Sequence, residues 1–254
     1  MNHLQSTPPR LPQSRTLSRA WALVLLAVMV AACTSVAPPA PAEATRSGSA
    51  DPAWSSRYAA LAATGGTVLR IDPQRSQIRI LVFRGGRAPS LGHNHVLTAP
   101  EFSGYFFLPA NGPAGAQFDL EFALDRLALD DPQLRKQLGA PFSAELTPGD
   151  IANTRAHMLG EDNLQAERYP YVRIHGLTVT GEGNHFAVSA AVELHGQSRV
   201  MTLPLVVEGL PGQVRASGSF VLRQSDFGVH PYSALGGFIA VQDEVWVEFT
   251  LVGG

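Results

Sequence analysis

Two histidines separated by one residue are the densest group of chemically active side chains in this sequence. His93 and His95 flank Asn94 in the segment LGHNHV (91–96), which follows RGGR (84–87). On a strand, residues i and i+2 point to the same face, so the two imidazoles could bind one metal ion or contact one ligand. A third interpretation is structural: one imidazole bonds to the backbone while the other faces solvent.

A metal site at this position needs a further ligand, and the neighbouring sequence offers none. There is no His-x-x-x-His pattern and no acid pair beside the two histidines. The other candidate ligands are distant in sequence: His157, His175, His195 and His230. We therefore assign no metal ligand. A histidine-dependent metal protein or enzyme that uses His93 and His95 remains the alternative hypothesis.

Other kinds of active site find no support in the sequence. No Gly-x-Ser-x-Gly segment is present, and the glycine pairs at 85–86 and 236–237 form no phosphate-binding loop. Asp125, Asp130 and Asp131 are typical of strand ends and helix caps. The formal charge is -2 without a basic block, which disfavours a nucleic-acid partner. We predict a protein that is not an enzyme and has no cofactor.

The first 32 residues have the layout of an export signal. Arg10, Arg15 and Arg19 precede a short apolar run at 20–30. Such a run is too short for a permanent membrane span, which needs about 20 apolar residues. Small residues then lead to Cys33, the only cysteine, in a segment that resembles the lipobox of bacterial lipoproteins.

This resemblance implies cleavage before Cys33 and a lipid on its thiol; an ordinary signal cleaved at an Ala-x-Ala site is the alternative. Thr34 follows the cysteine in place of Asp, which implies the outer membrane as destination and the periplasm as compartment. Residues 33–66 begin Pro/Ala-rich, so we predict an extended tether there, with a possible short helix at 54–63. The globular domain then spans 67–254.

From residue 67 onward, apolar residues recur at every second position, as they do in half-buried strands. The regular segments are 78–82, 118–124, 186–194, 214–222 and 245–251, and less regular ones are 96–108, 171–179 and 199–207. Short turn signals separate most of them. Eight consecutive antiparallel strands predict an all-β meander, and closure into a barrel would remove its exposed edges.

A helical insert interrupts this pattern between 126 and 170. Asp131 can cap a short helix that begins at Pro132 and ends near Gly139. Residues 147–150 resemble a capping box for a second helix that ends near Gly160. We expect the two helices to cross or close one end of the barrel.

Several segments in this order carry a family resemblance. They are IDPQRS (71–76), Asn163-Leu164 with Tyr169-Pro170, VELHG (192–196), RQSDFGV (223–229) and VQDEV (241–245). Together they make the chain from about 68 to 252 resemble the YceI-like family. The resemblance implies an eight-stranded antiparallel, lipocalin-like barrel that holds a long apolar chain, of polyisoprenoid, quinone or fatty-acyl type. The histidine pair and the longer insert depart from the better-known members.

Such a barrel can hold one ligand if some of its inward side chains are small. We therefore predict a lumen with a polar mouth for the head group of the ligand. Its predicted ligand-binding residues are His93, His95, Phe118, Phe122, Arg155, Ala190, Gly218, Phe220 and Arg223. Ser225 and Asp226 lie beside Arg223 and also fit a turn cap. The sequence leaves the oligomeric state open.

Overall fold

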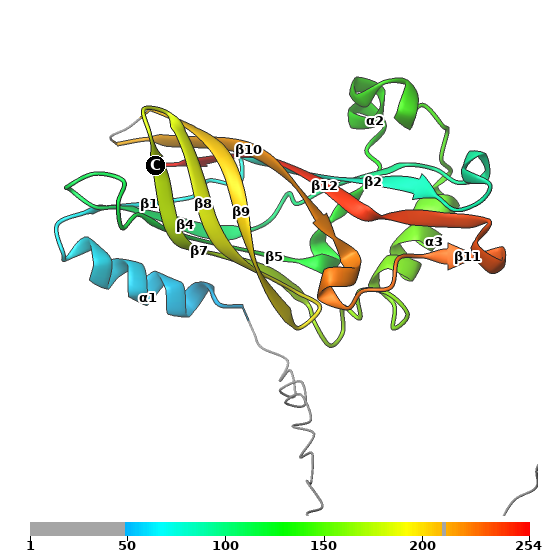
Figure 1. The fold of residues 1–254 in the computed structure, drawn as a ribbon, viewed down its shortest axis with the longest axis horizontal. Helices are drawn as coiled ribbons and strands as arrows, with labels where there is room; N and C mark the ends of the chain where they lie inside the picture. Colours follow the sequence, from blue (N-terminus) through cyan, green and yellow to red (C-terminus); the bar gives the residue numbers. More distant parts are fainter. Residues whose placement is uncertain (1–48, 210–211) are drawn as a thin grey trace, which may run out of the picture. The chain divides into compact units, whose positions relative to one another are not determined.

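The computed structural model describes residues 49–209 and 212–254, all of which belong to the second of two compact units, 41–254 (Figure 1). Its strands are β1 (Thr67–Arg70), β2 (Gln77–Gly85), β3 (His95–Thr98), β4 (Ser103–Leu108), β5 (Gln117–Ala123), β6 (Ala128–Leu129), β7 (Tyr171–Glu182), β8 (His185–Leu194), β9 (Gln197–Glu208), β10 (Val214–Arg223), β11 (Ser233–Ala234) and β12 (Ile239–Gly253). Its α-helices are α1 (Asp51–Ala62), α2 (Pro132–Leu138) and α3 (Pro148–Leu159).

The strands form one antiparallel sheet that curls and meets itself. Its order is β1-β4-β5-β7-β8-β9-β10-β12-β2-β3-β6, with the short β11 on β12. The first and last parts of the meander pair along β2 and β12, and Ile71 forms a further bridge to Gly253. The predicted eight-stranded antiparallel barrel is thereby confirmed.

The larger strand count arises because three of the eight long strands are bent. β2 pairs with β3 while β1 pairs with β4, so β1 with β2 and β3 with β4 are two interrupted strands. β5 and β6 continue one another in the same way against β4 and β3. The predicted strand 96–108 is one of these, interrupted at 99–102.

The insert forms the two predicted helices, and their caps explain where they begin. The Asp131 carboxylate accepts hydrogen bonds from the amides of Gln133 and Leu134 at the start of α2. Thr147 and Asp150 form a reciprocal capping box at the start of α3. β6 pairs only with β3, and α3 lies at this end of the barrel (Figure 1).

Helix α1 packs on the outside of the barrel. Tyr58 is buried and stacks on Tyr105 of β4, with ring centroids 5.0 Å apart. Its hydroxyl donates to Asp119 of β5 at 2.8 Å, and Arg57 also binds this carboxylate. The short helix expected at 54–63 within the predicted tether, 33–66, is present as α1, and the tether from residue 49 onward lies on the barrel. The predicted signal, Cys33 and the rest of the tether fall outside the described residues.

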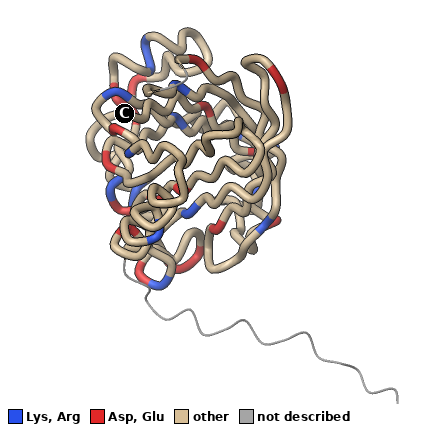
Figure 2. The backbone as a smooth tube through the Cα atoms, turned by 90° about the vertical axis from the view of Figure 1, so that its left-hand side faces the viewer, with Lys and Arg blue, Asp and Glu red and all other residues tan. Residues whose placement is uncertain are grey.

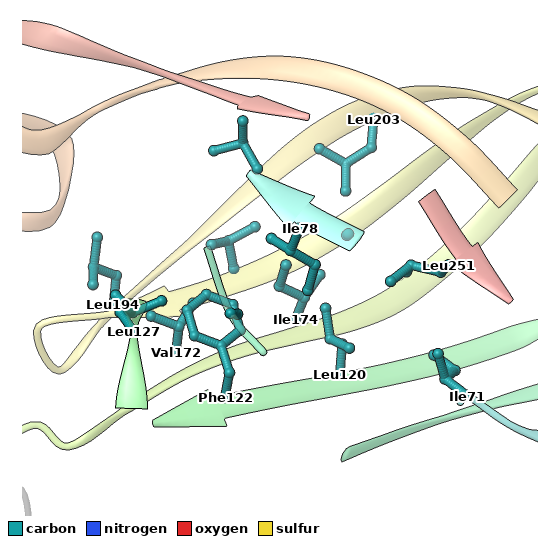
Figure 3. Close-up of a cluster of buried hydrophobic side chains, with 14 of the residues drawn as sticks. Ile71, Ile78, Leu120, Phe122, Leu127, Val172, Ile174, Leu194, Leu203 and Leu251 are labelled. Carbon is teal, nitrogen blue, oxygen red and sulfur yellow. The ribbon is translucent and has the colours of Figure 1, made fainter. Parts of the chain in front are cut away.

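The apolar core lines the inside of the curled sheet. Figure 3 shows buried side chains from several strands, including Ile78, Phe122 and Leu203, pointing toward one another. Acidic and basic residues are interspersed along the backbone in Figure 2. Within the described ranges, no helix is both long and apolar enough to span a bilayer.

Candidate functional site

A cavity of about 490 Å³ lies inside the barrel, within the 300–1,000 Å³ range of ligand sites. Its wall is apolar and draws on nearly every strand. The apolar lining residues are Ile78, Ile80, Val82, Leu97, Phe106, Phe118, Leu120, Phe122, Leu124, Leu127, Leu129, Met158, Leu164, Val172, Ile174, Val192, Leu194, Leu203, Leu205, Ala216, Phe220, Leu222, Val241, Val245, Val247, Phe249 and Leu251. Strand alternation produces this wall, since every second side chain points inward.

Polar groups enter the lining mainly from α3 and the loops around it. Helix α3 contributes Asp150, Asn153, Thr154 and His157, whose spacing of three and four residues places them on one face. The remaining polar lining residues are His93, His95, Asn163, Gln224 and Tyr232. The rings of His157 and Tyr232 lie 5.0 Å apart. The cavity therefore combines an apolar lumen with a polar mouth.

His95 is held in one orientation by a buried carboxylate. Its Nδ1 lies 2.7 Å from Asp130, whose side chain is fully buried. Asp130 also accepts hydrogen bonds from Arg135 at 2.6 Å and from the Val96 amide at 3.1 Å. Burial alone would raise the pKa of Asp130, but the hydrogen bond and charge of His95, with these other donors, hold it below its ordinary value. Nδ1 of His95 thus donates to a carboxylate, and in this tautomer Nε2 can accept a hydrogen bond.

His93 is exposed and lies near the N-terminus of α3. Hydrogen bonds from the hydroxyl and amide of Thr147 hold the pKa of Asp150 below its ordinary value, with a smaller contribution from the charge of His93. The two histidines therefore differ in role. His95 is fixed against the barrel wall, whereas His93 faces a solvated carboxylate.

Of the predicted binding residues, the two histidines and the three phenylalanines line the cavity. Phe118 packs over Gly176 of the next strand, where a Cβ atom would come within 2.4 Å of its ring. Phe220 lies against Phe249, with ring centroids 6.4 Å apart. These positions place the predicted residues on the wall; a role in binding stays a prediction.

Of the small residues expected to leave room in the lumen, Ala216 lines the cavity, whereas Ala190 and Gly218 do not. Ala190 is fully buried within the apolar core. At Gly218, an added Cβ would lie 2.4 Å from the carbonyl oxygen of Pro204 and 2.8 Å from the ring of Phe249. Neighbouring atoms already occupy the space that these residues leave, so they serve close packing.

The two predicted arginines are also absent from the lining, because each is bound elsewhere. Arg155 reaches the carbonyl oxygens of Asp125 and Leu127, and so ties α3 to the barrel. Arg223 pairs with Glu244 at 3.2 Å on the outside and is 61% exposed. Both positions correct the prediction of Arg155 and Arg223 as ligand-binding residues.

Sequence reasoning assigns no functional role to Asp150, Asn153 or Thr154 of α3, and it names His157 only as a distant candidate metal ligand. It also assigns Asp130 to a strand end or helix cap. The capping box fixes the start of α3, and its i, i+3, i+4, i+7 polar positions were the available signal. No set of three His, Cys, Asp or Glu groups in the described ranges is arranged to hold a metal ion. The third ligand that the metal hypothesis needs is therefore missing from this part of the chain.

Comparison with known proteins agrees with this architecture. A profile of the YceI-like domain matches residues 69–253. The chain belongs to the YceI-like family. The match leaves out α1, which is an addition to the N-terminal side of the family domain.

Solved structures similar to this chain have low sequence identity to it, and one of them, BcnA, has a TM-score above 0.5. BcnA of Burkholderia cenocepacia is 15% identical with a TM-score of 0.53, over 72% of this chain and 99% of its own. A polyisoprenoid binding domain from Saccharophagus degradans, implicated in plant cell wall breakdown, is 14% identical with a TM-score of 0.48, over 73% and 97%. The Campylobacter jejuni YCEI protein is 10% identical with a TM-score of 0.41, over 61% and 83%. No curated protein matches the chain.

Proposed function

We propose that this YceI-like domain binds a long apolar chain inside its barrel and carries or sequesters it without chemical conversion. The observation that supports this most directly is the cavity of about 490 Å³, whose wall is apolar except at the mouth. Each methylene moved from water into such a wall stabilises the complex by about 0.8 kcal/mol. An isoprenoid, quinone or acyl chain fits this wall.

The mouth favours a head group that donates a hydrogen bond. With Nδ1 of His95 committed to Asp130, Nε2 has no partner among the described residues and is available as an acceptor at the cavity. A hydroxyl head could donate to it. We propose His95 as the head-group contact and His93 as part of the polar rim, with Phe118, Phe122 and Phe220 against the chain.

The proposed function is tested on the full-chain protein purified from its own cells. Native mass spectrometry and lipid extraction measure whether an apolar ligand co-purifies with it. Leu205→Trp fills the lumen and should abolish a co-purifying apolar ligand. Val200→Trp, on the outer face of the same strand and 66% exposed, is the matched control and should keep it. A ligand retained in Leu205→Trp, or no apolar ligand in the unchanged protein, would refute the function.

The head-group contact is tested with an isoprenoid alcohol and the hydrocarbon that lacks its hydroxyl. The alcohol should bind about tenfold more tightly than the hydrocarbon, because an unpaired polar group typically costs about that much. His95→Ala should remove this preference, while His185→Ala, at the exposed start of β8 and outside the cavity lining, should keep it. An unchanged preference in His95→Ala would exclude the contact.

We further propose that the protein is a lipoprotein, anchored to the outer membrane through Cys33 and facing the periplasm. The support is the signal-like segment and the single cysteine after small residues. Metabolic labelling with a radioactive fatty acid should mark the protein, and Cys33→Ser should abolish the label. Labelling that persists in Cys33→Ser would contradict the anchor.

A further inference from the structure

Exposed apolar side chains gather where the β2–β3 and β11–β12 connections meet. Eight large apolar residues are exposed in the described part of the chain, and three of them lie here: Leu91, Leu235 and Phe238. Leu91 is 61% and Leu235 72% exposed. We call residues 87–92 and 235–238 the apolar tip. This concentration on two short loops distinguishes the tip from single exposed residues elsewhere.

The two loops form one connected structure. The amides of Arg87 and Ala88 donate to the carbonyl oxygens of Gly237 and Phe238 at 3.0 and 2.9 Å. The guanidinium of Arg87 donates to the Gly236 carbonyl at 2.8 Å and lies 4.3 Å from the Phe238 ring centroid. The apolar side chains are therefore presented on a fixed backbone.

The backbone at Leu235 is strained in a way that folding alone does not explain. Leu235 has φ of 51°, in the left-handed region that bulky residues rarely adopt. Its side chain gains no burial in return, since it is mostly exposed. Strained residues of this kind cluster at functional sites. A large apolar side chain held outward at such a position points to a binding partner.

The charge at the tip indicates the chemistry of that partner. The two segments that contain the tip, 83–94 and 229–241, include Arg84 and Arg87 and no acidic residue. The whole chain, by contrast, carries a net charge of -2. Arg84 donates to the Gly92 carbonyl, and among the described residues neither arginine pairs with a carboxylate. Exposed apolar groups beside cations match the boundary between lipid head groups and acyl chains in an anionic bilayer.

The tip also borders the mouth of the cavity. His93 lies two residues after Leu91, and Tyr232 lies three residues before Leu235; both line the cavity. Figure 1 shows the β2–β3 connection and β11 with its following turn at the same end of the barrel as α3. A bilayer in contact with the tip would face the mouth.

We propose that the apolar tip inserts among the head groups of an anionic bilayer and docks the mouth of the barrel on the membrane. A long apolar ligand can then pass between bilayer and cavity without crossing water. This proposal goes beyond ligand binding, because the contact belongs to the tip whether or not the cavity is occupied.

The depth of the tip in the membrane is measured in the full chain with the substitution Cys33→Ser. This substitution removes the only cysteine and with it the proposed lipid anchor, so the anchor does not decide the result. Leu91→Cys then carries one environment-sensitive fluorophore. On vesicles of equimolar phosphatidylcholine and phosphatidylglycerol, the emission should shift to the blue, and a doxyl-labelled lipid should quench it. A fluorophore at Val200→Cys is the matched control and should be quenched far less. Equal quenching at the two positions would overturn the proposal.

A second variant separates the tip from the rest of the chain. Asn tolerates a positive φ better than most residues, so Leu235→Asn keeps the backbone of the tip. Combined with Phe238→Ser, it should reduce quenching at position 91 to the level of the control. The circular dichroism spectrum should stay unchanged. Val200→Asn should change nothing. Quenching should be weaker on phosphatidylcholine alone, and equal quenching there would overturn the role of the arginines. Leu205→Trp, which tests the cavity, should leave tip quenching intact, so the two proposals fail independently.

Discussion

At the scale of the residue, Asp130 connects the barrel wall, the insert and the mouth. Its φ of 56° turns the chain sharply between β6 and α2, in a conformation that Asp tolerates better than most residues. The turned carboxylate then meets His95, the Val96 amide and Arg135. Arg135 in turn donates to the carbonyl oxygens of Asn94 and Ala144. One buried carboxylate therefore fixes the histidine segment to the insert.

Replacement of this carboxylate should be costly. Asp130→Asn leaves the buried Arg135 without its charge partner, and we expect the free energy of unfolding to fall by about 3–5 kcal/mol in urea titrations at pH 7. Asp131→Asn is the matched control, because Asn caps a helix about as well as Asp, and it should cost little. Similar losses in both variants would refute the role of the buried pair.

The same substitution predicts a dependence on pH. The pKa of Asp130 is lower in the folded state than in the unfolded chain, so its ionisation stabilises the fold above the unfolded pKa. This contribution is lost as pH falls through the folded value. The stability difference between the unchanged protein and Asp130→Asn should therefore be constant near pH 7 and shrink below about pH 4. A difference that grew in acid would contradict this sign.

At the scale of the element, α1 shows how a surface can be hidden from sequence reasoning. Alternation in 118–124 correctly predicts that Phe118, Leu120 and Phe122 point inward. It also suggests that Asp119 and Glu121 face solvent, yet they are 1% and 3% exposed because the segment from residue 49 covers them. Strand periodicity identifies the two faces of β5, but the partner that covers its outer face lies about 60 residues earlier in the chain.

Helix α1 should contribute measurably to the stability of the barrel. Burial, opposed in part by Arg57, raises the pKa of Tyr58 to about 12, so its hydroxyl remains a donor to Asp119 at physiological pH. Tyr58→Phe removes this bond to a buried charge and should lower the free energy of unfolding by about 1.5–3 kcal/mol. Ser56→Ala, at an exposed position of the same helix, should change it little. Proteolytic cleavage within α1 should become faster only in Tyr58→Phe. Equal cleavage rates in Tyr58→Phe and Ser56→Ala would show that the Tyr58 hydrogen bond does not keep α1 packed on the barrel.

At the scale of the whole molecule, the segments that carry the family resemblance mostly build corners of the barrel. In 71–76, Ile71 is buried and bridges β12, while the Asp72 carboxylate accepts from the Gln74 amide. In 223–229, Gln224 donates to the Gln242 carbonyl, and Ser225 binds Asp243. These contacts explain why the resemblance predicts the fold well.

The ligand site was predictable only in part, because its shape depends on contacts between strands that are far apart in the sequence. Periodicity places the inward phenylalanines, but the room inside the lumen depends on how neighbouring strands pack, as Gly218 and Ala190 show. The two arginines were misplaced because their partners, Glu244 and the carbonyl oxygens of 125 and 127, come from the folded structure. Residue types reveal candidate donors, whereas barrel closure decides which of them reach the cavity.

A hydroxyl at the bend between β1 and β2 adds to the β2–β12 pairing that closes the sheet. The Ser76 hydroxyl donates to the Asp72 carbonyl at 2.6 Å and accepts from the amide of the buried Val252 at 2.9 Å. The hydroxyl thus accepts a hydrogen bond from an amide of β12 at the bend, where β1 and β2 offer this amide no backbone partner. Ser76→Ala should leave that amide unsatisfied and lower the free energy of unfolding by about 1–3 kcal/mol, with faster hydrogen exchange at Val252. Ser143→Ala, whose hydroxyl bonds within an exposed turn, should leave both quantities unchanged. If Val252 exchanged no faster in Ser76→Ala, the Ser76 hydroxyl would not be the group that protects this amide.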